Sequence, residues 1–355
     1  MKLEDIDKNF KLDTVKEEDI VWYDIENAPF SIHGVFYDEK EEQYLRLPRA
    51  VADSINDGVR VLNHNTAGGR VRFITDSPYT ALRAVVQKGW AMPHMPASGS
   101  HGFTLYVDGK FQKAYFPPIE QNESEDIAFE GIAYLHSYAL CNADIYFPLY
   151  NGARKVFIGL KKGCSLQPPK AYRYAKPVLF YGSSITQGGC ASRPGNDYIS
   201  LLSRKFDFDY INLGFSGSAR AEKEMVEYIA SQEASVFVLD YDHNAPNPEH
   251  LRNTHLPLYE AIRAKHKDAP ILMISHPDSD FFANSDERRD IVKNTYLTAK
   301  KRGDKKVAFV DGHTLFQKED RDGCTVDGAH PNDLGFYRMA ETIAPVLKKL
   351  LKKCK

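Results

Sequence analysis

The sequence predicts two domains: an all-β, jelly-roll-like sandwich over residues 1–173, then a three-layer α/β/α domain with a parallel five-stranded sheet over residues 174–355. Two observations support this. In the first part, short apolar runs are separated by turn residues, which is typical of a sandwich. In the second part, apolar runs alternate with helical patterns, which indicates repeated βα units. A chain of 355 residues is long enough for both domains.

The first part contains several short apolar runs bounded by turn residues. Residues 70–74 and 81–86 are separated by Asp-Ser-Pro-Tyr. Asp108-Gly109 stands between two further runs, and this dipeptide predicts a hairpin. Asn151-Gly152 predicts a second hairpin in the same way. We find no convincing amphipathic helix between these runs.

A proline-rich stretch at residues 165–170 is the predicted connector to the second part. Strands are expected near residues 177–183, 209–214, 235–240, 270–275 and 307–311, and helices near 196–206, 220–231, 250–267, 286–302 and 333–351. The last helix has an apolar stripe at helical spacing. Pro345 is expected to bend this helix or to lie on its outer side. Repeated βα units imply a parallel sheet with helices on both faces.

The composition is that of an ordinary globular protein and excludes several classes. With 46 Lys and Arg against 48 Asp and Glu, the near-zero net charge gives no support for binding to nucleic acid or to an anionic membrane. The sequence has no apolar run of membrane-spanning length, and the polar residues 1–13 are not expected to be a secretory signal. Five scattered cysteines are expected to be free thiols, so we expect a cytoplasmic location, although removal of a leader would leave the same pattern.

Four groups of polar or glycine residues follow predicted strands or precede the last helix. They are Ser183-Ser184, Gly214 to Gly217, Asn244, and Asp327 with His330. Because the carboxyl ends of parallel strands share one edge of a sheet, we expect these groups to meet there. A serine at that edge predicts a nucleophile. The alternative is that both serines only cap the next helix.

In this order, the four groups resemble the SGNH (GDSL-type) hydrolase superfamily, over the half of the chain from Pro177 to the C-terminus. Two positions depart from the family pattern. Ser183 stands where the family usually has Asp, and Asp242-His243-Asn244 stands where many members have Gly-x-Asn-Asp. The resemblance implies a flavodoxin-like hydrolase domain. A preceding β-domain resembles the layout of two-domain carbohydrate acetylesterases.

The resemblance implies that Ser184 is the nucleophile, His330 the base and Asp327 the acid that orients the base. A serine hydroxyl needs such a base within hydrogen-bond reach, and a carboxylate fixes the tautomer of the imidazole. The alternatives are that His330 is a surface-loop histidine and Asp327 an ordinary turn residue before Gly328.

The resemblance also implies an oxyanion hole made by the backbone N–H groups of Ser184 and Gly217 and the side chain of Asn244. Gly214 is expected to permit close packing of strand against helix. Asn244 has an alternative role as a turn residue before Ala245-Pro246.

Three further residues are candidates for substrate binding: Arg193, Asp197 and His243. Arg193 and Asp197 are equally well explained as solvated loop residues, and His243 as a residue that fills space. The spacing of Asp240, Asp242, His243 and His330 matches no known metal template, and there is no phosphate-binding loop or dinucleotide fingerprint. We therefore expect no metal and no cofactor.

The sequence thus predicts a serine ester hydrolase that removes short acyl groups, acetyl above all, from a small-molecule or oligosaccharide ester, as the resemblance implies. The loops at residues 187–197 and 278–287 are mostly polar, whereas long acyl chains need an apolar groove. A thioesterase or lysophospholipase-type acyl hydrolase is the alternative among enzymes. An inactive glycan-binding protein is the alternative of another class. The oligomeric state stays open.

Overall fold

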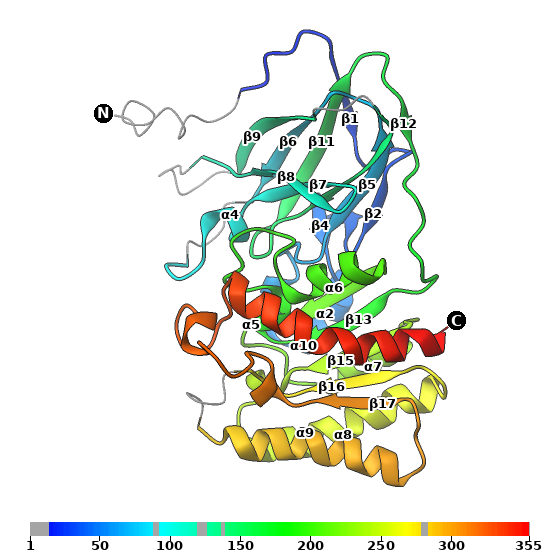
Figure 1. Cartoon of the computed structure of the whole chain (residues 1–355), viewed down its shortest axis with the longest axis vertical. Coiled ribbons are helices and arrows are strands. Elements are labelled where there is room, and N and C mark those ends of the chain that lie inside the picture. Colours follow the sequence, from blue (N-terminus) through cyan, green and yellow to red (C-terminus); the bar gives the residue numbers. More distant parts are fainter. Residues whose placement is uncertain (1–13, 88–91, 119–125, 136–138, 278–282, 355) are drawn as a thin grey trace.

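The computed structural model describes residues 14–87, 92–118, 126–135, 139–277 and 283–354. The second half of the chain forms a parallel five-stranded sheet in the order β14-β13-β15-β16-β17 (Figure 1). Its strands are β13 (Val178–Gly182), β14 (Tyr210–Gly214), β15 (Val236–Asp240), β16 (Ile271–Ile274) and β17 (Val307–Val310). All four pairings are parallel. This order is that of flavodoxin-like folds, as predicted.

Helices cover both faces of this sheet, so the domain has the three predicted layers. One hydrophobic cluster joins the sheet to α6 (Tyr198–Phe206) and α10 (Asp333–Leu351). A second cluster joins the other face to α7 (Lys223–Ser231), α8 (Pro248–Lys265) and α9 (Ser285–Lys301). A short helix, α5 (Ser184–Gln187), follows β13 directly. Pro345 lies within α10 on its exposed side, which is one of the two predicted placements.

The first half of the chain forms two antiparallel sheets around a core of its own, as expected for a sandwich. One sheet has the order β1-β11-β6-β9, and the other has β12-β5-β10-β7-β8 with β2 paired to β5. The strands are β1 (Ile20–Asp24), β2 (Ser31–His33), β5 (Arg70–Thr75), β6 (Tyr79–Val86), β7 (Phe103–Val107), β8 (Lys110–Tyr115), β9 (Ile127–Tyr134), β10 (Cys141–Tyr146), β11 (Ala153–Lys161) and β12 (Leu166–Gln167). A separate pair consists of β3 (Phe36–Asp38) and β4 (Gln43–Leu45).

Two details of this half differ from the prediction. Asp108 and Gly109 join β7 to β8 as a hairpin, both with positive φ, but Asn151-Gly152 joins strands of different sheets and makes no hairpin. Helices also interrupt the strands: α2 (Arg49–Ile55), α3 (Asp57–Leu62) and α4 (Ala97–Ser100). Ala52 and Val59 of the first two are buried in the hydrophobic cluster of α7, α8 and α9, so tertiary packing stabilises helices whose own sequence pattern is weak.

Buried arginines join the two halves. Arg70 of β5 is completely buried, pairs with Asp209, and lies 3.7 Å from the ring centre of Tyr210. Arg46 lies 4.2 Å from the ring centre of Phe215. The two halves are therefore packed against each other at the edge where β14 lies. The predicted division at residue 173 falls in a segment without helix or strand, and it stays a prediction.

None of the helices that the structure describes is both long enough and apolar enough to cross a membrane. All five cysteine thiols are free.

Candidate active site

Ser184 lies at the carboxyl end of β13, at the first position of α5. Ser183, one residue earlier, is the N-cap of this helix, and its hydroxyl accepts the backbone N–H of Ile185 at 3.2 Å. The capping role proposed as an alternative for both serines therefore belongs to Ser183. The hydroxyl of Ser184 points elsewhere, and its Oγ lies 3.0 Å from Nε2 of His330.

His330 is held by Asp327 in the loop before α10. Nδ1 of His330 lies 2.7 Å from Oδ2 of Asp327. The other carboxylate oxygen accepts the backbone N–H groups of His330 and Ala329 at 2.7 and 3.0 Å. Burial raises the pKa of Asp327, but these hydrogen bonds outweigh it and bring the pKa down to about 2. Asp327 is thus ionised at neutral pH and accepts a hydrogen bond from Nδ1–H of His330, which leaves the lone pair of Nε2 to accept a hydrogen bond from the hydroxyl of Ser184.

The loop itself is tied into a hairpin-like shape. Thr325 and Pro331 form an antiparallel bridge, and the N–H of Val326 donates to the carbonyl of His330 at 3.0 Å. Asn332 then caps α10 by accepting the N–H of Gly335. The backbone therefore fixes both His330 and Asp327 against a long helix.

Gly217 and Asn244 lie in turns after β14 and β15. One N–H of the Asn244 side chain donates to the carbonyl of Phe215 at 2.8 Å, so the asparagine joins the two turns. The amide nitrogen carries a second N–H, which remains for another acceptor. Gly217 has a φ of +65°, and a Cβ there would meet no atom within 4 Å, so its backbone is open. Gly214, by contrast, packs against α5, where a Cβ would lie 2.2 Å from the backbone nitrogen of Gln187.

Two of the three candidate substrate-binding residues have structural roles. Both carboxylate oxygens of Asp197 accept hydrogen bonds from Ser200, one from its N–H at 2.9 Å and one from its hydroxyl at 2.6 Å. Asp197 is only 1% exposed and caps α6, so it is a helix cap and does not face a substrate. The guanidinium of Arg193 stacks 4.2 Å from the ring centre of Phe111 in β8, and this contact joins the two halves of the chain.

His243 packs edge-on against the ring of His276, at 5.5 Å between ring centres. His276 belongs to a second set of hydrogen-bonded side chains, which the sequence did not predict. Nδ1 of His276 lies 2.9 Å from Oδ2 of Asp242, and Nε2 lies 2.7 Å from the hydroxyl of Ser285. We call Asp242, His276 and Ser285 the inner set. It supports the short 3-10 turn Asp242–Asn244, which carries Asn244.

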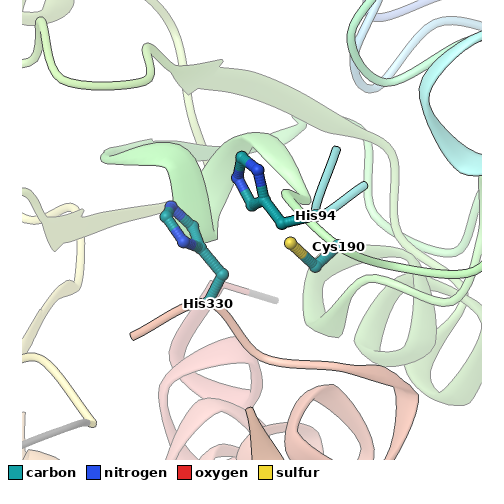
Figure 2. A group of neighbouring side chains, drawn as sticks. All are labelled: His94, Cys190 and His330. Carbon is teal, nitrogen blue, oxygen red and sulfur yellow. The ribbon is translucent and has the colours of Figure 1, made fainter. Parts of the chain in front are cut away.

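The β-rich half also reaches the site. The hydroxyl of Tyr150 donates to the carbonyl of Ser184 at 3.1 Å, and that of Ser98 donates to the carbonyl of Ser192 at 2.6 Å. His94, from the segment before α4, faces the ring of His330 at 5.3 Å between ring centres, with Cys190 beside them (Figure 2). Sequence spacing gives no sign of these contacts, because they join residues far apart in the chain.

The α/β fold and the hydrogen-bonded Ser184, His330 and Asp327 form an arrangement typical of serine hydrolases. Residues 175–348 match the model of the GDSL-like lipase/acylhydrolase family, and residues 20–166 match the model of the N-terminus of SGNH-hydrolase-type esterases. The chain therefore belongs to the GDSL-like (SGNH) hydrolases, and it is an esterase by family. No curated protein is significantly similar to the sequence.

Solved structures share the fold over nearly the whole chain. A protein named a GDSL-like lipase, from Bacteroides ovatus ATCC 8483, is 26% identical, with a TM-score of 0.82 over 94% of this chain and 98% of that one. A salicylyl-acyltransferase from a tetracycline biosynthetic pathway is 19% identical, with a TM-score of 0.75 over 94% and 98%. A family two carbohydrate esterase from Cellvibrio japonicus is 13% identical, with a TM-score of 0.59 over 95% and 99%. The last two likenesses establish the fold.

Proposed function

We propose that this protein is a serine esterase that removes short acyl groups, acetyl above all, from O-acetylated carbohydrate. One observation carries the catalytic part of the proposal. Ser184, His330 and Asp327 form one chain of hydrogen bonds, of 3.0 Å from Oγ to Nε2 and 2.7 Å from Nδ1 to the carboxylate. This is the arrangement that activates a serine hydroxyl.

In the proposed mechanism, Nε2 of His330 takes the proton of Ser184 as Oγ attacks the ester carbonyl. Asp327 stays ionised and stabilises the imidazolium that forms. The protonated Nε2 then gives its proton to the leaving alcohol, and an acyl-enzyme on Ser184 remains. A water molecule, deprotonated by His330, attacks this acyl group and releases the carboxylic acid and the free serine.

The negative charge that develops on the carbonyl oxygen needs hydrogen-bond donors in fixed positions. The proposed donors are the backbone N–H groups of Ser184 and Gly217 and the free N–H of Asn244. The bond from Asn244 to the carbonyl of Phe215 supports this role, because it fixes the amide plane before substrate arrives. Such a preset donor costs no reorganisation during the reaction.

The polar loop after α5 supports a short acyl group on a hydroxyl-rich alcohol. In this loop the backbone N–H of Ser192 and the side chain of Asn196 both donate to Asp333, at 2.8 and 2.7 Å. These hydrogen bonds hold the loop against the start of α10, next to the loop of His330. A structural neighbour of the same fold, a family two carbohydrate esterase from Clostridium thermocellum, was solved in complex with cellohexaose. The second loop that is mostly polar in the sequence spans residues 278–287. Its residues 278–282 lie outside the described part of the chain.

One observation favours the alternative, an esterase for longer acyl chains. Val326, in the loop that carries His330, and Leu334 and Tyr337, at the start of α10, are 46, 42 and 55% exposed. Exposed apolar side chains beside a site offer an acyl chain a surface. If the protein were an inactive glycan-binding protein, the hydrogen-bonded Ser184, His330 and Asp327 would have no role. This disfavours that alternative.

The test is a series of p-nitrophenyl esters from acetate to decanoate, together with acetate release from acetylated oligosaccharides. We expect kcat/KM to fall as the acyl chain lengthens, and we expect acetate release from the oligosaccharides. Ser184→Ala is the control for background hydrolysis. If kcat/KM rises with chain length, the acetylesterase proposal is wrong and the lipase-like alternative stands. If no ester is cleaved, the result favours the alternative of an inactive glycan-binding protein.

A further inference from the structure

Three side chains with metal-binding atoms meet beside the candidate site. They are His94, Cys190 and His330, and one ligand atom of each lies within 4.8 Å of the others. Figure 2 shows them grouped, although they come from three separate segments: the one before α4, the loop after α5 and the loop before α10. Two imidazole nitrogens and one thiolate are a ligand set that Zn²⁺ favours.

His330 already has the partner that a zinc-binding histidine needs. Zinc-bound histidines usually donate their other ring N–H to a carboxylate, which fixes the tautomer and increases the basicity of the ligand. Nδ1 of His330 lies 2.7 Å from Oδ2 of Asp327, so Nε2 is the nitrogen with a free lone pair. The same Nε2 accepts the hydroxyl of Ser184 at 3.0 Å. A metal ion and this hydroxyl would therefore compete for one lone pair.

The other two ligands differ in freedom. His94 is exposed, so its ring can turn to bring a nitrogen to the ion. Cys190 is 4% exposed, and burial together with the charge of Asp327 raises the pKa of its thiol to about 12. Binding must displace this proton: the S–H bond breaks, a sulfur–zinc bond forms, and one H⁺ goes to solvent. A divalent cation next to the sulfur favours that step.

We propose that His94, Cys190 and His330 form a site for Zn²⁺ that inhibits the enzyme reversibly. The ion occupies Nε2 of His330, so the histidine can no longer take the proton of Ser184. It also joins the segment around His94 in the β-rich half to two loops of the α/β half. The inhibition rests on the proposed role of His330, whereas the binding of the ion does not.

The first experiment is a titration of p-nitrophenyl acetate hydrolysis with Zn²⁺ after removal of bound metal. We expect inhibition that excess EDTA reverses. His94→Ala and Cys190→Ala should keep activity without metal and should raise the Zn²⁺ concentration for half inhibition by roughly tenfold or more, since even indirect ligand partners have effects of about that size. Cys164→Ala and His266→Ala are matched controls away from the site, and they should leave this concentration unchanged.

The second experiment needs no activity. Co²⁺ in place of Zn²⁺ should give a thiolate-to-cobalt charge-transfer band in the near ultraviolet that Cys190→Ala loses and Cys164→Ala keeps. Zn²⁺ should also raise the melting temperature, since it binds the folded state. The band and the melting shift test the site even if no ester is cleaved. Three results would overturn the proposal: inhibition equal in wild type, His94→Ala and Cys190→Ala; no thiolate band; or a loss of activity on treatment with EDTA.

Discussion

Among the described residues, two Ser-His-Asp sets have similar hydrogen-bond distances but different surroundings. In the candidate active site, His330 lies 3.0 Å from Ser184 and 2.7 Å from Asp327. In the inner set the corresponding distances are 2.7 Å to Ser285 and 2.9 Å to Asp242. Distances alone would make the inner set an equally good serine hydrolase site.

The exposure of the histidine and the aspartate separates the two sets, whereas both serines are buried, with Ser184 5% and Ser285 7% exposed. The side chains of His330 and Asp327 are 22 and 34% exposed, whereas those of His276 and Asp242 are each 1% exposed. The guanidinium of Arg288 closes the inner set by donating to the carbonyls of Asp242 and Ala245 at 2.6 and 2.9 Å. A buried set of this kind holds loops together, and here it holds the turn of Asn244. A catalytic set needs a path for substrate and open donors beside it.

Replacing the two serines gives the sharpest test of this comparison. Ser184→Ala should lower kcat by several orders of magnitude, as loss of a nucleophile does, with an unchanged melting temperature. Ser285→Ala should keep kcat within a few-fold and lower stability by about 1 kcal/mol, the value of one hydrogen bond. Esterase kinetics and thermal melts of both variants are the measurements. An inactive Ser285→Ala with normal folding would reverse our assignment of the two sets.

Asn244 lies on the turn that the inner set supports, and its second amide N–H is the proposed oxyanion donor for the first set. Asn244→Ala should lower kcat by roughly a hundredfold with little change in KM, since the donor acts mainly in the transition state. Steady-state kinetics with an acetyl ester measures this split. A large rise in KM at constant kcat would instead assign Asn244 to ground-state binding of the substrate.

The sequence could predict the first set but not the second, for a physical reason. The turn of Ser184 and the pair Asp327 and His330 match motifs of a known superfamily, and this resemblance assigned their roles. Asp242 and His276 also follow parallel strands, β15 and β16, which bring their carboxyl ends to one edge. However, neither they nor Ser285 match such a motif, and only the fold shows that these side chains touch. The same limit explains why the contact of His94 with His330 was not predicted.

Other differences had local causes. Asp197 lies at the start of the helix predicted near residues 196–206 and three residues before Ser200, which is the spacing of an N-cap, whereas it was interpreted as a loop residue or a substrate-binding residue. Helices α2 and α3 have only 7 and 6 residues, and isolated helices of that length are marginal in water. Their packing against the α/β half stabilises them, and a short sequence window does not contain this information.

Removing each histidine should separate the catalytic set from the structural one. His276→Ala leaves the carboxylate of Asp242 buried without its ring partner, so the free energy of unfolding should fall by about 3 kcal/mol. His330→Ala removes the proposed base, so it should abolish activity. Because the ring is partly exposed, the free energy of unfolding should stay nearly unchanged. Urea unfolding of both variants, with esterase assays beside it, gives the comparison. Equal stability losses would mean that both sets are structural.

The smallest expected effect concerns Asp240, which lies next to the inner set. Its Oδ2 accepts hydrogen bonds from Thr186 at 3.0 Å and Tyr198 at 2.8 Å. Burial, and then the charge of Asp242, raise the pKa of Asp240 to about 7. The folded carboxyl therefore keeps its proton where the unfolded one has lost it. Stability should fall as the pH rises from the unfolded pKa to the folded pKa, and this contribution should then stay constant.

From about pH 6 to about pH 8 this group should lower the free energy of unfolding by roughly 1 kcal/mol. Asp240→Asn keeps an oxygen acceptor for Thr186 and Tyr198 but cannot ionise, so it should remove this part of the pH dependence. The measurement is the difference between the free energies of urea unfolding at the two pH values. Any effect of the substitution on stability that does not depend on pH cancels in this difference. A pH dependence identical to that of the wild type would show that Asp240 is ionised in the folded protein throughout this range. The negative charge of the inner set would then have less influence on its neighbour than its burial implies.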